Sequence, residues 1–398
     1  MATGAYPAGP YPLKRVRDQQ MHKLGQVLWS WPICDDCRKN QHCITEKCPF
    51  PRAIRLMRYF EHYKALTASY EPDIRPGETP ALRTHDDLFD VLKQLKLMPD
   101  MPRAQLTGLV FQKRAQEQAP PTADKERALD LAVKIMVMVN CSARREPSGQ
   151  LEHGPHQIPW ASDVAFGQYI TNIFPITDNP SLNDDEAKAS TDIKSFLTAR
   201  KLKKRIGLRF QPTDNLGRHL KLDRKTNTIE IYHHTAFLKE HLRLTKDCPQ
   251  TMSVVQSLRL GALPRQLALE CLDSIQKILF PLWDPKSRAL LQTLVSKSSF
   301  DPDCLRFESA SIRNDEEKEI AYHYFGANLA DIFEELENPT PRGWLQPWLE
   351  RKSGARYLML ATLIGVIFAV VLGMATLAVN SYQAWISYQQ WQHPTASK

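Results

Sequence analysis

The sequence lacks the short motifs of the common enzyme classes. It contains no GxxxxGK(S/T), GxGxxG, HExxH or GxSxG pattern, so phosphate-binding loops, dinucleotide sites, helical zinc proteases and serine-hydrolase elbows have no support. Glycine is scarce, with 16 residues against 28 prolines. The sequence therefore favours a protein without enzymatic activity, although an active site assembled from distant residues remains an alternative.

Cysteine and net charge are also limited. Eight cysteines in 398 residues are too few for a small disulfide scaffold. The 52 basic and 44 acidic residues give a net charge of +8, which does not by itself demand nucleic acid. Hydrophobic residues at 42% and charged residues at 24% exclude a wholly disordered chain and a protein with many membrane spans.

One long apolar run lies near the C-terminus. Residues 357–379 contain no charged side chain, and as a helix they extend about 34 Å, enough to cross a hydrocarbon core of about 30 Å. Aromatic residues that favour the headgroup region stand on both sides: Trp344, Trp348 and Tyr357 at the start, and Tyr382, Trp385, Tyr388 and Trp391 after the run. The sequence predicts a single transmembrane helix.

The flanking charges predict the orientation of this helix. Arg342, Arg351, Lys352 and Arg356 precede the run and Lys398 alone follows it. Because basic flanks stay on the cytosolic side, we expect the bulk of the chain to be cytosolic and residues 380–398 to be lumenal or extracellular. This is the topology of a tail-anchored membrane protein, and the length of the span fits several membranes.

Small residues recur at every fourth position of the predicted span: Ala361, Gly365, Ala369 and Gly373. They share one helix face, which allows a partner helix to approach closely. The pattern allows a homo-oligomer formed through the span. The alternative is that small residues are simply common in membrane helices.

Four cysteines fall within a short N-terminal segment: Cys34, Cys37, Cys43 and Cys48, with His42 among them. A CxxC pair followed by two further thiolates can close a tetrahedral zinc site. Either Cys43 or His42 would be the third ligand, and the zinc would be structural. Two disulfides are disfavoured in the cytosol, and free or redox-active thiols remain an alternative.

Charge is distributed unevenly along the chain. Residues 194–246 carry 14 basic and 4 acidic side chains, whereas residues 301–337 carry 11 acidic and 3 basic ones. We expect these two regions to face each other or to balance the charge of the surface. Anionic lipid is the second interpretation of the basic region, and nucleic acid is an unlikely partner. The densest basic cluster consists of Arg200, Lys201, Lys203, Lys204 and Arg205.

A second basic group follows the cysteines. Arg52, Arg55 and Arg58 recur at helical spacing beside Tyr59 and Phe60. Such residues can bind single-stranded nucleic acid, but a solvated helix face is the interpretation that we favour.

The periodicity predicts a mainly α protein with a small antiparallel β element over 206–232, where alternating stretches end in a turn at 223–227. His233, His234 and His241 follow this element; no acidic or thiol residue has matching metal-ligand spacing, so we expect structural roles for them.

The predicted organisation is a disordered tail (1–30), a Cys-rich basic module (31–70), a linker (71–80), a helical module (81–140), a linker (141–160), a main α+β domain (161–338), a Pro-rich basic stalk (339–356), the transmembrane helix (357–379) and a short aromatic tail (380–398).

Three blocks carry a family resemblance: HHTAFLKEHLRLTKD at 233–247, the run from GALPRQLALECLDSIQKILFPLWD at 261–312, and ELENPTPRGWLQPWLERKSGARY at 335–357. Together with the C-terminal span and the cysteine cluster, the chain resembles a family of uncharacterised single-pass membrane proteins of filamentous fungi. The resemblance implies a membrane-anchored fungal protein and transfers no catalytic residue.

The function that we expect is that of a membrane-tethered cytosolic interaction or scaffolding protein with a structural zinc site. The alternatives are an enzyme without a recognisable motif that acts near the membrane, and a binder of anionic lipid or nucleic acid.

Overall fold

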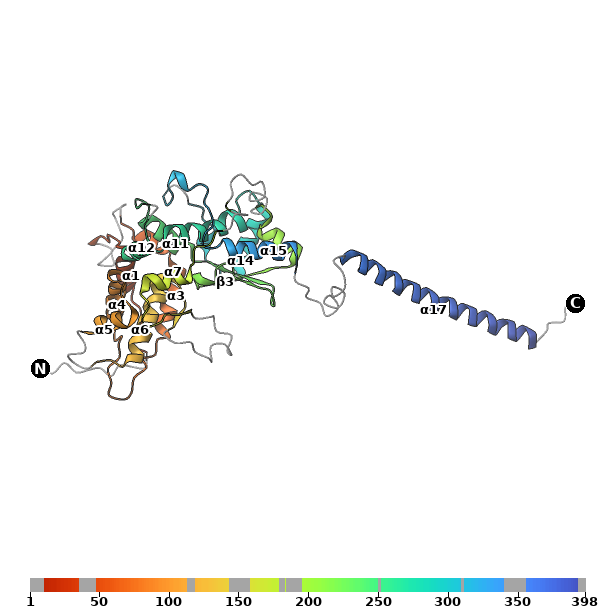
Figure 1. The fold of residues 1–398 in the computed structure, drawn as a ribbon, viewed down its shortest axis with the longest axis horizontal. Coiled ribbons are helices and arrows are strands. Elements are labelled where there is room, and N and C mark those ends of the chain that lie inside the picture. Colours follow the sequence, from red (N-terminus) through yellow and green to blue (C-terminus); the bar gives the residue numbers. More distant parts are fainter. Residues whose placement is uncertain are drawn as a thin grey trace. The chain divides into compact units, whose positions relative to one another are not determined.

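The computed structural model places the chain in two compact units, Met1–Asn338 and Pro339–Lys398. Helices dominate, so the prediction of a mainly α chain with a small β element and one long apolar C-terminal helix is confirmed. Figure 1 shows the fold. The structure describes residues 11–35, 48–112, 119–142, 158–178, 183, 195–249, 252–308, 311–339 and 356–392.

The N-terminal unit is built from short helices. Its α-helices are α1 (Asp18–Trp29), α3 (Met57–Ala68), α4 (His85–Leu97), α5 (Arg103–Val110), α6 (Thr122–Val137), α7 (Phe166–Ile173), α10 (Ala199–Ile206), α11 (Thr235–Leu244), α12 (Val254–Leu260), α13 (Arg265–Asp273), α14 (Pro285–Lys297) and α15 (Gly326–Glu337). Single turns are η1 (Phe50–Ile54), η4 (Leu216–Arg218), η6 (Pro302–Leu305) and η7 (Asp315–Glu317), and a π-helical turn, η5 (Ser274–Leu279), continues α13.

Local sequence explains where several helices begin. The Thr84 side chain accepts a hydrogen bond from the Asp87 N–H at the start of α4, and Asp87 returns the bond, which is a capping box. Ser253 and Gln256 do the same for α12. The apolar stripe of α4 is buried, and this helix packs against α1, α5, α6 and α12 (Figure 1).

The expectation of a disordered tail over residues 1–30 is wrong for the part that α1 occupies. This helix has an amphipathic pattern, and Leu24 and Leu28 on its inner face are fully or almost fully buried. Burial of two leucines removes enough apolar surface from water to hold a short helix in place.

The sheet has three strands in the order β3-β5-β4, with bounds Arg209–Thr213, Thr228–Tyr232 and Leu222–Asp223. The expected antiparallel pairing is present between β4 and β5. However, β3 pairs with β5 in parallel, so the sheet is mixed. Two further short strands, β1 (Cys141–Ser142) and β2 (Ile158–Pro159), pair in parallel within the segment predicted as a linker.

One hydrophobic core joins the segments that we predicted as separate modules. Its buried residues run from Leu13 to Leu336. Tyr59 from the Cys-rich segment packs against Phe237 of α11 with tilted rings whose centroids are 4.9 Å apart, and Trp29 packs edge-on against the same ring at 6.0 Å. The described segments of residues 31–338 therefore share one packed interior.

The segment 71–80, predicted as a linker, is held to this core by one buried carboxylate. Asp124 on α6 accepts hydrogen bonds from the Tyr70 hydroxyl at 2.8 Å, the Asp73 N–H at 3.1 Å and the Ala81 N–H at 2.6 Å. Charge-assisted hydrogen bonds of this kind are stronger than neutral ones, so both ends of the segment are fixed.

The C-terminal unit contains α17 (Arg356–Gln392). The most apolar 18 residues within its stretch Thr362–Gln392 have a mean hydropathy of 2.5, and the helix is long and apolar enough to cross a membrane. The predicted span 357–379 forms the first part of this helix. The helix continues through Gln392, so the predicted aromatic tail begins inside it, and Tyr382 and Trp385 stack on one another within the helix.

Candidate functional site

A cluster of one aspartate and three histidines lies where β3 and β5 end. The two strands run in parallel with Thr213 opposite Tyr232, so the next residues, Asp214 and His233, emerge at the same edge of the sheet. In α/β folds, functional residues usually lie just beyond the carboxyl ends of parallel strands. This edge is therefore the first candidate for a site.

Hydrogen bonds converge on the Asp214 carboxylate. Its Oδ1 accepts from Nε2 of His234 at 2.6 Å and from Nε2 of His233 at 3.2 Å. Its Oδ2 lies 3.4 Å from Nδ1 of His62 on α3. His233 and His234 are buried, whereas the Asp214 side chain is 51% exposed. The half-exposed Asp214 carboxylate thus contacts two buried imidazole rings and one that is partly buried.

Burial and hydrogen bonding set the charges of this cluster. Burial raises the pKa of Asp214, but hydrogen bonds from His233, His234 and His62 outweigh it and hold the pKa well below its usual range. Burial lowers the pKa of the His234 imidazole to about 4. At neutral pH the cluster therefore contains a carboxylate and a neutral His234.

The donor set is one that zinc or iron accepts in proteins, and the ligand atoms of Asp214, His233 and His234 lie within 4.8 Å of one another. The hydrogen bonds do not fit a metal. Nδ1 of His233 accepts the Asp301 N–H at 3.0 Å, so it cannot carry the N–H that a neutral ring bound to a metal through Nε2 would have. A metal-bound histidine normally donates its other N–H to a partner, and among the described residues the buried Nδ1 of His234 has none.

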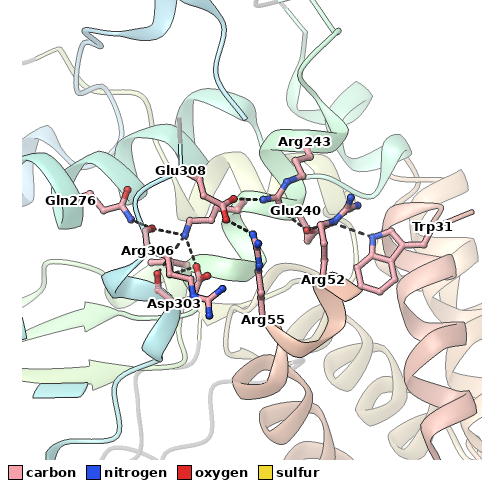
Figure 2. Close-up of polar contacts among 11 residues, drawn as sticks. Trp31, Arg52, Arg55, Glu240, Arg243, Gln276, Asp303, Arg306 and Glu308 are labelled. Atoms are coloured by element: carbon pink, nitrogen blue, oxygen red, sulfur yellow. Dashed lines mark hydrogen bonds and ion pairs between the residues drawn. The ribbon is translucent and has the colours of Figure 1, made fainter. Parts of the chain in front are cut away.

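The second candidate site is a ladder of alternating charges. Its members are, in order, Arg52, Glu240, Arg243, Glu308 and Arg55. Glu240 on α11 is 3% exposed and accepts hydrogen bonds from Trp31 at 3.2 Å and from Arg52 at 3.1 and 3.2 Å (Figure 2). Arg243 bridges Glu240 to Glu308. Trp31 and Arg52 lie on either side of the cysteine segment, so one buried carboxylate holds both of its flanks.

The other end of the ladder involves Arg55, which pairs with Glu308 (Figure 2). Arg52 and Arg55 are therefore bound to acidic residues of the same unit, and do not form the solvated face that we expected. Two of the three arginines are therefore poor candidates for binding nucleic acid, because acidic side chains already neutralise their charges.

Contacts between residues 194–246 and 301–337 confirm that these two regions face each other. Lys239 is buried and donates to Oδ2 of Asp303 at 2.6 Å and to the carbonyl of Arg306 at 2.8 Å. Arg224 pairs with Glu334 at 3.1 Å. Breaking a buried pair such as Lys239–Asp303 strands a charge, so this pairing belongs to the structure of the core.

Only some side chains of the basic cluster on α10 make contacts within the N-terminal unit. Lys201 and Arg205 cover the Phe196 ring at 4.6 and 5.5 Å, and basic residues in the last turn stabilise the helix C-terminus. Arg200, Lys203 and Lys204 are exposed. Within the described part of the chain, no ion pair involves Arg200, Lys201, Lys203, Lys204 or Arg205.

The predicted zinc ligands are described in part. Cys48 is buried and Cys34 packs against the same core. Cys37, Cys43 and His42 lie outside the described residues, so zinc binding stays a prediction.

The small-residue face of the span lies on α17. A Cβ added at Gly365 or Gly373 would meet no atom within 4 Å, and Ala369 is exposed. The side chain of Ala361 lies outside the described part of the chain. The face is thus open along its described length, and the homo-oligomer stays a prediction.

A pocket of about 320 Å³ lies between the end of α3 and α6. Its lining includes Asp130, which pairs with Arg103 at 2.9 Å. The thiol of Cys141 also lines it, and burial raises the pKa of this thiol to about 12. A thiol that stays protonated is a poor nucleophile, so this pocket does not favour the enzyme alternative.

No protein-family model, curated protein or solved structure matches the chain. The resemblance to fungal membrane proteins accordingly stays a prediction.

Sequence reasoning missed the role of Asp214. We expected structural roles for His233, His234 and His241 because no acidic residue had a matching spacing. The partner was 20 residues away along the chain and is brought close by the parallel pairing of β3 and β5. His241 has the structural role that we expected, since its buried Nδ1 accepts the Leu263 N–H at 2.8 Å.

Proposed function

We propose that the chain is a membrane-tethered interaction or scaffolding protein that displays its N-terminal unit on the cytosolic side. The observation that carries the proposal is α17, whose apolar stretch has no part buried within the protein. A helix that is apolar on all sides and has no core to cover it matches the hydrocarbon interior of a membrane.

Membrane integration can be tested by alkaline carbonate extraction of the full chain from isolated membranes. We expect the protein to stay in the pellet, and a variant with Ile367→Arg and Val371→Arg to move to the supernatant, because two charges at the centre of a span oppose insertion. Gln19→Arg with Gln105→Arg, which adds two positive charges at exposed positions outside α17, serves as the control variant. Extraction of the unaltered chain would exclude a transmembrane anchor.

A structural zinc ion in the cysteine segment is part of the proposal. The support is the position of Cys34 and Cys48 against the core, together with the clamp of Trp31 and Arg52 on Glu240, which keeps the flanks of the segment together. The ligands are Cys34, Cys37, Cys43 and Cys48, with His42 as the alternative to Cys43. Zinc held by such a set stabilises a fold and does no chemistry.

Elemental analysis of the purified chain under reducing conditions tests the zinc site. We expect one zinc per chain, and loss of it in Cys34→Ser/Cys37→Ser. Cys248→Ser, a half-buried cysteine outside the segment, is the matched control. Absence of metal would direct attention to redox chemistry or disulfides.

We also propose that the span associates with a second copy through the face of Ala361, Gly365, Ala369 and Gly373. Replacing Gly365 and Gly373 with isoleucine should abolish cross-linking between copies in membranes, because bulky residues prevent close approach of the helices. Val366→Leu with Val370→Leu changes the neighbouring face and should leave cross-linking intact. Equal cross-linking of all three proteins would contradict the proposal.

A further inference from the structure

One surface of the N-terminal unit combines exposed apolar and basic side chains. The turn before α14 exposes Leu282 and Trp283, with 55% and 65% of their surfaces accessible. The two side chains are neighbours in the chain and form one exposed apolar patch, a feature that can mark an interaction site.

The basic helix α10 lies beside this turn. The backbone N–H of Arg200 donates to the Ser287 hydroxyl at 3.1 Å, so the first turn of α10 meets the first turn of α14. Trp283 stands four residues before Ser287. The exposed Trp283 and the exposed side chain of Arg200 therefore belong to one region of the surface, next to α14, the helix labelled in Figure 1.

The charge of this region is positive. Arg200, Lys203 and Lys204 are exposed on α10, and Lys286 and Arg288 are exposed on the first turn of α14. Asp284, at the start of α14, is buried: its carboxylate accepts the Lys286 N–H at 3.1 Å and the Ser287 hydroxyl at 2.8 Å, and it also interacts electrostatically with Arg200. On the neighbouring helix α15, Glu334 and Glu335 are paired with Arg224, and Asp331 and Glu337 are exposed. These two acids are outnumbered by the five exposed basic side chains Arg200, Lys203, Lys204, Lys286 and Arg288.

We propose that this face, formed by the turn Leu282–Trp283 and the exposed basic residues of α10 and α14, docks on the anionic leaflet of the membrane that anchors the chain. Tryptophan favours the headgroup region of a membrane, and leucine adds apolar area that can enter the acyl chains. Each basic side chain near an anionic leaflet strengthens binding about fivefold. The inference rests on the proposed anchoring by α17.

The tether makes even weak docking effective. Residues 338–355 connect α15 to α17 and reach at most about 60 Å when fully extended. A unit confined to that distance meets the membrane at a high effective concentration. Single-stranded nucleic acid is the competing partner for a basic surface with an aromatic ring, but it gives Leu282 no apolar medium to enter.

The test uses the full chain in nanodiscs whose lipids carry a brominated acyl chain that quenches tryptophan. One set contains phosphatidylcholine alone and the other contains added phosphatidylserine. The signal of Trp283 is the difference between the unaltered chain and Trp283→Phe. We expect this difference signal to be quenched with phosphatidylserine, to recover in high salt, and to be unquenched in phosphatidylcholine.

Matched charge variants complete the experiment. Arg200→Glu/Lys203→Glu/Lys204→Glu should abolish the quenching of Trp283, since reversing three charges weakens docking at least about a hundredfold. Lys64→Glu/Arg75→Glu/Lys93→Glu, which reverses three exposed charges elsewhere in the unit, should retain it.

Three results would overturn the inference: no quenching in either lipid, equal quenching in both, or equal loss with both triple variants. A single-stranded oligonucleotide provides the test for nucleic acid. The surface would be assigned to nucleic acid if the oligonucleotide relieved the quenching at low salt and also bound the detergent-solubilised chain without lipid. Failure of the proposed anchoring is seen separately, because the chain would then not be incorporated into either kind of disc.

Discussion

Nε2 of His234 lies 2.6 Å from Oδ1 of Asp214, and this contact joins the ends of two parallel strands. The chain between them forms a turn and the edge strand β4 before it returns to β5. The pairing of Asp214 with His234 therefore depends on the whole sheet being formed, and it reports on the integrity of that sheet.

Replacing Asp214 with asparagine should destabilise the N-terminal unit by about 1–3 kcal/mol, because the amide retains one acceptor oxygen for two buried N–H donors and one partly buried donor. Urea unfolding of the full chain in detergent measures the change. Asp90→Asn, an exposed residue paired with Lys93, should lie within about 0.5 kcal/mol of the unaltered chain.

The same variant separates the hydrogen-bonded cluster from a metal site. If Asp214, His233 and His234 held a metal, a chelator would lower the stability of the unaltered chain more than that of Asp214→Asn, because removal of the proposed zinc from the cysteine segment would affect both proteins alike. We expect the destabilisation by Asp214→Asn to be the same with and without chelator, since the tautomer of His233 opposes metal binding.

Acidification should weaken the fold below neutral pH. Burial lowers the pKa of His219 and His241 to about 3 and of His234 to about 4, whereas the unfolded value is about 6.5. As the pH falls through 6.5, the unfolded chain takes up protons first, so stability is lost down to the folded pKa values. Each histidine contributes up to about 1.4 kcal/mol per pH unit in that window.

Asp301 acts in the opposite direction. Burial raises its pKa to about 7, so between the unfolded value of about 3.9 and 7 the folded chain holds the extra proton, and stability rises on acidification. Asp301→Asn removes this contribution. Unfolding measured from pH 7 to pH 5 should therefore show a steeper loss of stability in the variant; a shallower loss would contradict these assignments.

Gly261 and Gly207 make a matched pair of helix-ending glycines, with φ of +82° and +66°. A Cβ at Gly261 would collide with the Leu28 carbonyl oxygen, whereas at Gly207 it would meet only the Asn227 side chain at 3.6 Å. Gly207→Ala should cost about 1–2 kcal/mol from the left-handed backbone alone. Gly261→Ala should cost clearly more in the same thermal unfolding assay, and equal costs would refute the close approach.

The clamp on the cysteine segment predicts a local effect of Glu240→Gln. The neutral amide weakens the bonds to Arg52 and Arg243, with an expected loss of about 1–3 kcal/mol and faster hydrogen exchange near Trp31 and Arg52. Glu61→Gln removes an exposed partner of Arg58 and should leave exchange near Trp31 unchanged. Equal exchange in both variants would mean that Glu240 does not hold the flanks together.

Local signals carried much of the fold prediction. The helix that begins after Thr84, with its buried stripe, was predictable because a capping box and a helical period agree. The turn before β5 was predictable from polar residues between alternating stretches. The apolar run of α17 was the clearest signal, since its length and lack of charge exclude an ordinary surface helix.

Non-local contacts could not be predicted in the same way. The parallel pairing of β3 with β5 has no local signature, and without it Asp214 has no reason to meet His233 or His234. The burial of α1 depends on a groove made by later helices. The bonds of Arg52 and Arg55 to acidic residues 188 and 253 positions away likewise follow from the packed fold and leave no spacing pattern.

Glycosylation in microsomes tests the central claim, a membrane-anchored chain with a cytosolic N-terminal unit, most directly. The chain carries an Asn-x-Ser sequon at Asn140, and a second sequon can be added after Lys398. The account predicts one glycan, on the added C-terminal sequon, removed by mutation of that site. Modification of Asn140 with an unmodified C-terminal sequon would contradict the orientation, and modification of neither would contradict the transmembrane anchor.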